Sequence, residues 1–393
     1  MDFDPSWLLL GLPIAFVLGW LASRFDLRQW RMENRQAPKA YFRGLNFLLN
    51  EQQDQAIDAF IEAVQNDPDT QELHFALGNL FRRRGEYQRA VRVHEHLLGR
   101  ADLSRLDRDR AQHALAQDFL RAGLLDRAEA ALQKLEGTRY QSEARLALLA
   151  IYERSREWTQ AADIAQRLDD SEQASYGARR AHHLCEQASE RLAAGDLDAA
   201  DRLLRQAGVL APQAPRPAID MAGLQLRRGQ AADAFATLVA LTEQAPLALP
   251  LYADMLQQAA RASHRSGEAL ALLQRRYAAA ASIDVLEALM ALGGTPDTTE
   301  GADAAIAARS PREGYIAHLV KQPSLVAATR WLAGETFTQE GFHPQVQRVL
   351  DQATRPLLRY RCAACGFEAN QHYWHCPGCQ AWDSYPPRRV EEL

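Results

Sequence analysis

A repeat of 34 residues is the feature of this 393-residue sequence that most limits how the chain can fold. Gly44 and Gly78 are 34 residues apart, and so are Ala56 and Ala90. A fixed period of this length indicates stacked helix–turn–helix units rather than one globular core. A glycine also stands five positions ahead of an alanine in four pairs: Gly85/Ala90, Gly123/Ala128, Gly195/Ala200 and Gly229/Ala234.

Each recurring residue has a physical role in such a unit. The glycine accepts a positive φ in the turn, the alanine lies where two helices cross, and a proline twelve residues later ends the second helix. The pattern resembles the tetratricopeptide repeat. In the fourth copy Arg156 replaces the turn glycine. We count six or seven copies, which begin near residues 37, 71, 109, 142, 181, 215 and 250, and the closing prolines are Pro68, Pro212 and Pro246.

We therefore predict a repeat array over 37–292. A turn-rich break follows at 293–301. We expect further helices after the break to cap the stack, and we assign 293–354 to this capping segment. A stacked array leaves a long concave groove for a peptide or protein partner. For any single groove residue, ordinary helix surface is the competing interpretation. The residues that we predict to line the groove are Tyr41, Phe75, Asn79, Arg82, His113 and Gln117.

The N-terminal segment is predicted to be a membrane anchor. Residues 7–22 carry no charge, which approaches the ~20 residues that span a bilayer, and Trp7 and Trp20 suit its two interfaces. A cleaved signal peptide is the alternative, but Asp2 and Asp4 stand where a basic stretch would be needed. We predict an anchor over 1–23 and a basic linker over 24–36. Because positive charge stays in the cytoplasm, the N-terminus should be periplasmic and the bulk of the chain cytoplasmic.

The C-terminal segment 355–393 contains two CxxC pairs, Cys362/Cys365 and Cys376/Cys379. Two residues between cysteines allow one tight turn to present both thiolates to the same ion, and two such turns complete a tetrahedral four-sulfur site. This spacing predicts a small metal-binding domain, and zinc and iron both suit it. Catalytic zinc keeps an open position for water, so we expect a structural role.

The residues around these cysteines are interpreted as supporting groups. His372 and His375 are placed outside the ligand set, because four thiolates already saturate the ion. The fifth cysteine, Cys185, is predicted to be a small buried apolar residue. The aromatic residues that we expect to pack around the site are Phe367, Tyr373, Trp374, Trp382 and Tyr385.

The charge and the missing motifs argue against two function classes. The net charge is −5, and the C-terminal segment has no basic excess that would attract nucleic acid. No phosphate-binding loop, GxGxxG, HExxH or GxSxG motif occurs. His94 and His96 flank Glu95, but neighbouring helix positions point in different directions, so we interpret all three as surface. An enzyme is not expected.

The order of anchor, repeat array and terminal CxxC pairs, with the segment YRC-x2-CGF…YWHCP-x-C-x-AW, resembles the lipopolysaccharide assembly protein B family of Gram-negative bacteria. The predicted fold class is all-α, with a transmembrane helix, a tetratricopeptide superhelix and a rubredoxin-like or zinc-ribbon metal domain. The resemblance implies metal ligation by the four clustered cysteines, with iron slightly favoured over zinc.

The resemblance also implies a non-enzymatic inner-membrane adaptor. Such a protein brings the deacetylase that commits cells to lipid A synthesis to a membrane-bound ATP-dependent metalloprotease. Other lipopolysaccharide assembly proteins and a second copy of the chain are further expected partners. Two alternatives remain: a membrane-tethered scaffold for lipopolysaccharide enzymes with no role in proteolysis, and an electron-transfer protein that would need iron.

Overall fold

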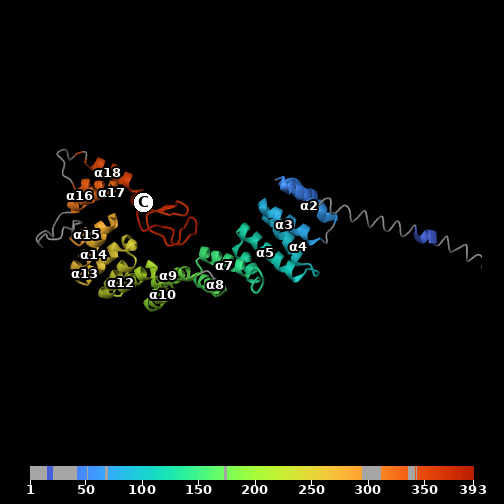
Figure 1. Ribbon diagram of the computed structural model, residues 1–393, viewed down its shortest axis with the longest axis horizontal. Helices are drawn as coiled ribbons and strands as arrows, with labels where there is room; N and C mark the ends of the chain where they lie inside the picture. Colours follow the sequence, from blue (N-terminus) through green and yellow to red (C-terminus); the bar gives the residue numbers. More distant parts are fainter. Residues whose placement is uncertain are drawn as a thin grey trace, which may run out of the picture. The chain divides into compact units, whose positions relative to one another are not determined.

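The computed structural model describes residues 16–20, 42–50, 52–66, 70–171, 175–293, 311–334, 341 and 343–393 (Figure 1). The fold is mostly helical and resembles a tetratricopeptide array, with a small two-stranded sheet near the C-terminus. The chain divides into two compact units, unit 1 over 1–151 and unit 2 over 152–393, and the division falls within helix α7.

Unit 1 is built from consecutive helix pairs. Successive helices from α2 to α6 pack against one another, and apolar side chains such as Phe60, Leu77 and Phe81 fill the space between them. After a first helix over 42–49, the elements are α2 (Gln53–Asn66), α3 (Gln71–Arg83), α4 (Tyr87–Leu98), α5 (Arg105–Ala122), α6 (Leu125–Gln133) and the beginning of α7 (Gln141–Ser155).

Unit 2 continues the pairs and adds the C-terminal helices. Its largest core surrounds Phe235, Tyr252 and Tyr277, which are almost fully buried. The elements are α8 (Trp158–Ser171), α9 (Gly177–Ala193), α10 (Leu197–Leu210), α11 (Pro215–Arg227), α12 (Ala231–Gln244), η1 (Pro246–Leu251), α13 (Ala253–Ala262), α14 (Ser266–Ala279), α15 (Ile283–Ala291), α16 (Pro311–Lys321), α17 (Leu325–Ala333) and α18 (His343–Thr354).

The predicted roles of the repeat residues are confirmed. The turn glycines have φ values between 73° and 82°. Helices α10 and α12 end just before Pro212 and Pro246, whereas Pro68 lies outside the described residues. Arg156 adopts φ 60° in the turn where glycine is missing, so the fourth copy keeps the turn despite its side chain. The alanines at the helix crossings are completely buried: Ala56, Ala90, Ala128, Ala161, Ala200 and Ala234.

The predicted anchor falls almost entirely outside the described residues. Of segment 1–23 only 16–20 is described, and it is helical with exposed apolar side chains. The linker 24–36, Tyr41 and most of the turn-rich break also lie outside the described part. Within the described ranges no helix has both the length and the apolar character needed to cross a membrane.

The C-terminal segment returns to the helices of unit 2. Strands β1 (Tyr360–Arg361) and β2 (Glu368–Ala369) pair antiparallel, and the chain ends in a short helix η4 (Val390–Glu392). Glu391 accepts hydrogen bonds from the backbone amides of Leu325 (2.5 Å) and Val326 (3.0 Å), and Glu392 accepts one from Ile283 (2.6 Å). These carboxylates satisfy free amides at the N-termini of α17 and α15. The metal-binding segment is thereby tied to both helices.

Candidate metal centre and its docking surface

The two CxxC turns have the same backbone hydrogen bonds. The amides of Cys362 and Cys376 each donate to the carbonyl five residues later, in both cases at 2.9 Å. The amides of Gly366 and Gln380 each donate to the carbonyl oxygen of the first cysteine of their turn, also at 2.9 Å. Both of these residues have a positive φ, 78° for the glycine and 62° for the glutamine. The chain thus builds one turn twice, although only one copy has the glycine that this backbone favours.

These turns bring four sulfur atoms together. The Sγ atoms of Cys362 and Cys379 are 3.8 Å apart, those of Cys365 and Cys376 are 3.7 Å apart, and all four lie within 4.8 Å of one another. Sulfurs bound at about 2.3 Å to a tetrahedral ion are separated by about 3.8 Å. The donor set therefore fits one four-coordinate ion, and both zinc and iron accept it.

Hydrogen bonds favour the thiolate form of the first cysteine. Burial alone would raise the pKa of Cys362, but the Ser384 hydroxyl, 3.2 Å from its sulfur, and the backbone amides of Cys365 and Ala364 outweigh burial and lower the pKa to about 6. The thiolate is the form that ligates metal. An ion held by all four cysteines would have no open position, and the chemistry it supplies is stabilisation of this small domain.

The neighbouring histidines contact carbonyl groups. His372 Nε2 lies 3.1 Å from the carbonyl oxygen of Tyr385, and His375 Nε2 lies 3.1 Å from that of Gln380. Tyr373 and Tyr385 pack with the buried cysteines, as predicted. The two tryptophans, Trp374 and Trp382, pack on His372 and His375 beside the cysteines, with ring centroids 4.7 and 4.3 Å apart, and they also contact helices of the array.

Trp382 is the centre of this docking contact. Its ring stacks on His182 of α9, with centroids 4.8 Å apart, and meets Trp158 edge to face at 6.1 Å. Its Nε1 donates to Glu153 Oε1 at 3.1 Å. Asp383, the next residue, lies 2.9 Å from His182 Nε2. Aromatic packing and a charge-assisted hydrogen bond therefore fasten the metal-binding segment to α7 and α9.

Glu153 is a buried carboxylate with a full set of partners. Its side chain is only 4% exposed, and it accepts two hydrogen bonds from Arg179, both at 2.6 Å, and one from His183 at 2.7 Å. Burial alone would raise the pKa of Glu153, but Arg179 and His183 lower it to about 2. The carboxylate stays ionised at neutral pH and can hold the indole of Trp382.

Of the six residues predicted to line the groove, four are half-buried, one lies outside the described residues and one is buried in the core. Asn79 and Arg82 on α3 and His113 and Gln117 on α5 are half-buried. Arg82 donates to Asp118 Oδ1 at 2.9 Å, and His113 stacks on Tyr140 at 4.4 Å. The structure therefore places these four on the first helices of two successive repeats. Tyr41 lies outside the described residues.

Two sequence interpretations are corrected in unit 1. Phe75 is 2% exposed and packs in a core with Leu97 and Ala111, so it does not line a groove. His94 is fully buried rather than on the surface, and its Nδ1 lies 2.5 Å from Asp118 Oδ2. Its partner is 24 residues away, so no local pattern reveals the contact. Cys185, by contrast, is 1% exposed, which confirms its predicted burial.

Comparisons with known proteins cover both the metal-binding segment and the whole chain. Residues 360–386 match the family described as rubredoxin metal binding domain. Lipopolysaccharide assembly protein B of Escherichia coli (strain K12) is 32% identical over 97% of this chain and 98% of that protein. The Haemophilus influenzae protein of the same name is 26% identical, over 98% of each chain. A solved tetratricopeptide repeat protein from Parabacteroides merdae is 15% identical over 66% of this chain and 99% of that one, with a TM-score of 0.33.

Proposed function

Because the chain belongs to the lipopolysaccharide assembly protein B family, we propose that it is a non-catalytic adaptor that limits lipopolysaccharide synthesis. It presents the deacetylase that commits cells to lipid A to a membrane-bound ATP-dependent metalloprotease. The observation that carries this proposal is the match with the relatives over 97% of the chain, which includes both the repeats and the metal-binding segment. A repeat array offers a broad surface for a folded client, and an adaptor raises the effective concentration of protease and substrate.

The proposal assigns a role to each part of the chain. Residues 1–23 anchor the protein in the inner membrane with the N-terminus in the periplasm, 24–36 is a basic linker, and the array over 37–292 with its capping segment 293–354 holds the client in the cytoplasm. Segment 355–393 binds one metal ion through Cys362, Cys365, Cys376 and Cys379, with iron slightly favoured over zinc. Asn79, Arg82, His113 and Gln117 belong to the client-binding surface, and a second copy of the chain is a further partner.

The test is affinity purification of the tagged full-length protein from gently solubilised membranes, followed by mass spectrometry. We expect both the membrane protease and the deacetylase to copurify, and the half-life of the deacetylase to lengthen several-fold when the protein is depleted. Recovery of lipopolysaccharide synthesis or transport enzymes without the protease, with an unchanged half-life, would replace the adaptor by a scaffold.

A paired variant tests the client-binding surface. The double substitution His113→Ala and Gln117→Ala removes half-buried polar groups from α5 and should weaken recovery of the deacetylase. Arg92→Ala changes an exposed residue of α4, the second helix of its pair, and should leave recovery unchanged. Equal recovery with both variants would remove this part of α5 from the proposed surface.

A further inference from the structure

The charged residues of the metal-binding segment are nearly balanced in number but not in position. Segment 355–393 has five arginines and four acidic residues. Three of the acids face the array. Asp383 lies 2.9 Å from His182 Nε2, and Glu391 and Glu392 accept hydrogen bonds from backbone amides at the N-termini of α17 and α15. These carboxylates are therefore engaged on the side of the segment that docks.

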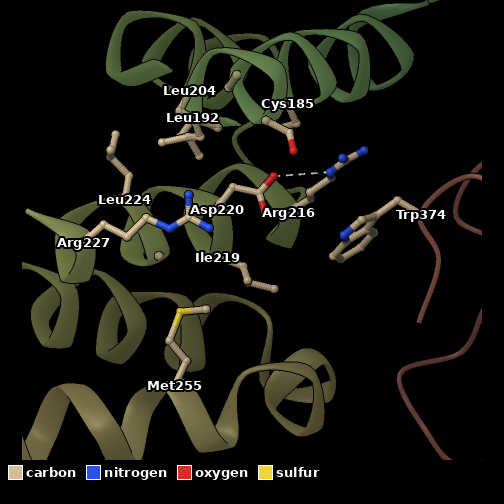
Figure 2. Close-up of a pocket in the computed structure, with 13 residues that line it drawn as sticks. Cys185, Leu192, Leu204, Arg216, Ile219, Asp220, Leu224, Arg227, Met255 and Trp374 are labelled. Carbon is tan, nitrogen blue, oxygen red and sulfur yellow. Dashed lines mark hydrogen bonds and ion pairs between the residues drawn. The ribbon is translucent and has the colours of Figure 1, made fainter. Parts of the chain in front are cut away.

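The docked side also uses one arginine and carries the tryptophans. Trp374 lies beside Arg216 of α11, whose guanidinium carbon is 5.9 Å from the ring centroid (Figure 2). Arg389 donates to both oxygens of Asp284 on α15, at 3.0 and 2.8 Å. Four arginines and one acidic residue therefore belong to the rest of the surface of the segment.

Two of these arginines share the one acidic residue. Arg361 of β1 donates to Oε1 of Glu368 on β2 at 2.7 Å. Arg359, which precedes β1, lies 3.6 Å from Oε2 of the same carboxylate. The side chains of both arginines are more than 40% exposed, so their guanidinium groups can also reach a second acidic group.

The other two arginines adjoin this pair. The amide of Val390 donates to the carbonyl oxygen of Arg359 at 2.7 Å, which brings the backbone next to Arg388 to the same place. Arg355 stands four residues before Arg359, in a stretch of helical turns. Both Arg355 and Arg388 are exposed, and neither forms an ion pair with any residue that the structure describes. Four guanidinium groups thus gather around one carboxylate, a local surplus of three positive charges.

Helix α18, which leads into the metal-binding segment beside α17, has an exposed apolar face (Figure 1). Val346 and Val349 are 48% and 66% exposed and lie one turn apart, and Ala353 continues the same side of the helix. Arg348 and Arg355, seven residues apart, lie on the adjoining side. An apolar stripe on the surface is therefore bordered by the arginines.

We propose that α18 and the arginines around β1 bind an acidic amphipathic helix of a partner protein. Apolar side chains of that helix pack on Val346 and Val349, and its carboxylates accept hydrogen bonds from Arg355 and Arg388. A helix that inserts into a bilayer interface carries large residues such as tryptophan, phenylalanine and leucine, whereas the exposed apolar residues of α18 are valine, alanine and proline. The chemistry of this surface therefore favours a protein over a lipid partner, and the surface is separate from the proposed client-binding residues of α3 and α5.

The test measures binding of fluorescent helical peptides to the full-length, metal-loaded protein in phosphatidylcholine nanodiscs, with empty nanodiscs as the blank. Three peptide pools of about 18 residues, five turns of helix, are compared by fluorescence anisotropy. The first has a leucine stripe flanked by glutamates, the second has glutamine in place of glutamate, and the third has glutamine in place of leucine. We expect the first pool to bind at least about tenfold more tightly than either control, because several weak ion pairs act together with apolar burial.

Two double variants with the same change in charge test the arginines. Arg355→Glu with Arg388→Glu should abolish the preference for glutamate over glutamine, because it reverses both unpaired charges at the proposed contact. Arg121→Glu with Arg202→Glu changes exposed residues of α5 and α10 and should keep the preference. Thermal unfolding and metal content show that each variant is folded.

A second pair of variants tests the apolar stripe. Val349→Gln should weaken binding of the first pool several-fold, since it removes an apolar contact without adding a charge. Val209→Gln makes the same change at a valine of α10 that is 82% exposed and should leave binding unchanged. Equal weakening by both variants would show that the stripe on α18 is not the contact.

Two results overturn the proposal as a whole. One is equal binding of the glutamate and glutamine pools, and the other is a glutamate preference that survives Arg355→Glu with Arg388→Glu. A lipid partner is measured by sedimentation with vesicles that contain phosphatidylglycerol. Vesicle binding that this double variant abolishes, without any preference among the peptide pools, would assign the arginines to an anionic lipid surface instead. Copurification of the protease and the deacetylase does not depend on these results, so the adaptor proposal is tested separately.

Discussion

Asp118 in unit 1 and Glu153 in unit 2 are both carboxylates buried on the first helix of a repeat, but they differ in what completes their surroundings. Asp118 is 0% exposed and receives Arg82 of α3 and His94 of α4. All three residues come from neighbouring repeats within 36 positions of sequence. This polar cluster is therefore part of the ordinary stacking of the array.

Glu153 has the same kinds of partner and one more. Arg179 and His183 approach it from α9, as an arginine and a buried histidine approach Asp118. The additional donor is Trp382, 229 residues away in the metal-binding segment. A polar cluster that only stacks repeats in one unit therefore serves in the other unit as a docking site for another domain, because one acceptor position of its carboxylate is still available.

Metal removal should produce the largest difference between the two clusters. Structural four-ligand sites contribute about 10–16 kcal/mol of binding free energy, so chelation or Cys376→Ser should unfold the segment that presents Trp382 to Glu153. We expect hydrogen exchange to increase around α9 while α3 to α5 keep their protection. Equal loss of protection around Asp118, or full retention of metal by Cys376→Ser, would contradict this expectation.

Replacing Glu153 or Asp118 by alanine distinguishes docking of the metal-binding segment from stacking of the repeats. Removal of one member of a buried ion pair costs about 3–5 kcal/mol, and we expect both Glu153→Ala and Asp118→Ala to lower stability by such an amount. Only Glu153→Ala should also release the metal-binding segment, detected as new protease cleavage near residue 355. If Asp118→Ala exposes the same cleavage site, the two clusters are not independent.

Lowering the pH should reduce the stability that the Glu153 cluster contributes. Its pKa is lowered from 4.5 to about 2, so the carboxylate contributes stability above pH 4.5 that is lost as the pH falls towards 2. The shift corresponds to about 3 kcal/mol. The difference in unfolding free energy between the wild type and Glu153→Gln should therefore shrink over that interval. A difference that stays constant down to pH 2 would show that ionisation of Glu153 does not carry the contact.

Gly78→Ala should damage only the cluster of unit 1. An added Cβ would lie 2.5 Å from His94 Nε2, and the ring is fully buried beside Asp118, so overpacking should cost about 1–3 kcal/mol. Gly223→Ala in α11 is the matched control, because its Cβ has room and alanine favours a helix. Denaturant unfolding measures both, and equal effects would rule out the contact with His94 as the cause.

Trp382→Phe should have the smallest effect. The substitution keeps an aromatic ring on His182 but removes the Nε1 donor to Glu153, which we expect to cost about 1 kcal/mol. The metal content should not change, and the segment should exchange amide hydrogens faster without becoming detached. A loss as large as that of Glu153→Ala would show that ring size, rather than the hydrogen bond, decides docking.

Local sequence patterns predicted the parts of this molecule that depend on local contacts. The repeat period anticipated the turn glycines, the buried alanines and the helix ends before Pro212 and Pro246. Arg156 shows that the period determines the turn even where its usual residue is absent. The spacing of the cysteines likewise anticipated a four-sulfur cluster, because the hydrogen bonds of each turn lie within six consecutive residues.

The contacts that depend on distant residues could not be predicted in this way. Trp374 and Trp382 stand beside the cysteines in sequence, and both rings contact a neighbouring histidine as expected, but each also has a partner about two hundred residues earlier that no local pattern indicates. Glu153 was missed for the same reason. A charged residue in a helical stretch is usually exposed, and only the presence of Arg179 and His183 one repeat later explains its burial.

The long separation between Glu153 and Trp382 also has a consequence for how the protein is made. At about 5–20 residues per second, a ribosome needs roughly 10–45 s to add the 229 residues between them. While the last 199 of these residues are added, the newborn chain carries Trp158, His182 and His183 without the tryptophan that later covers them. The surface around these three residues is therefore different during synthesis from the one that remains once Trp382 has docked on it.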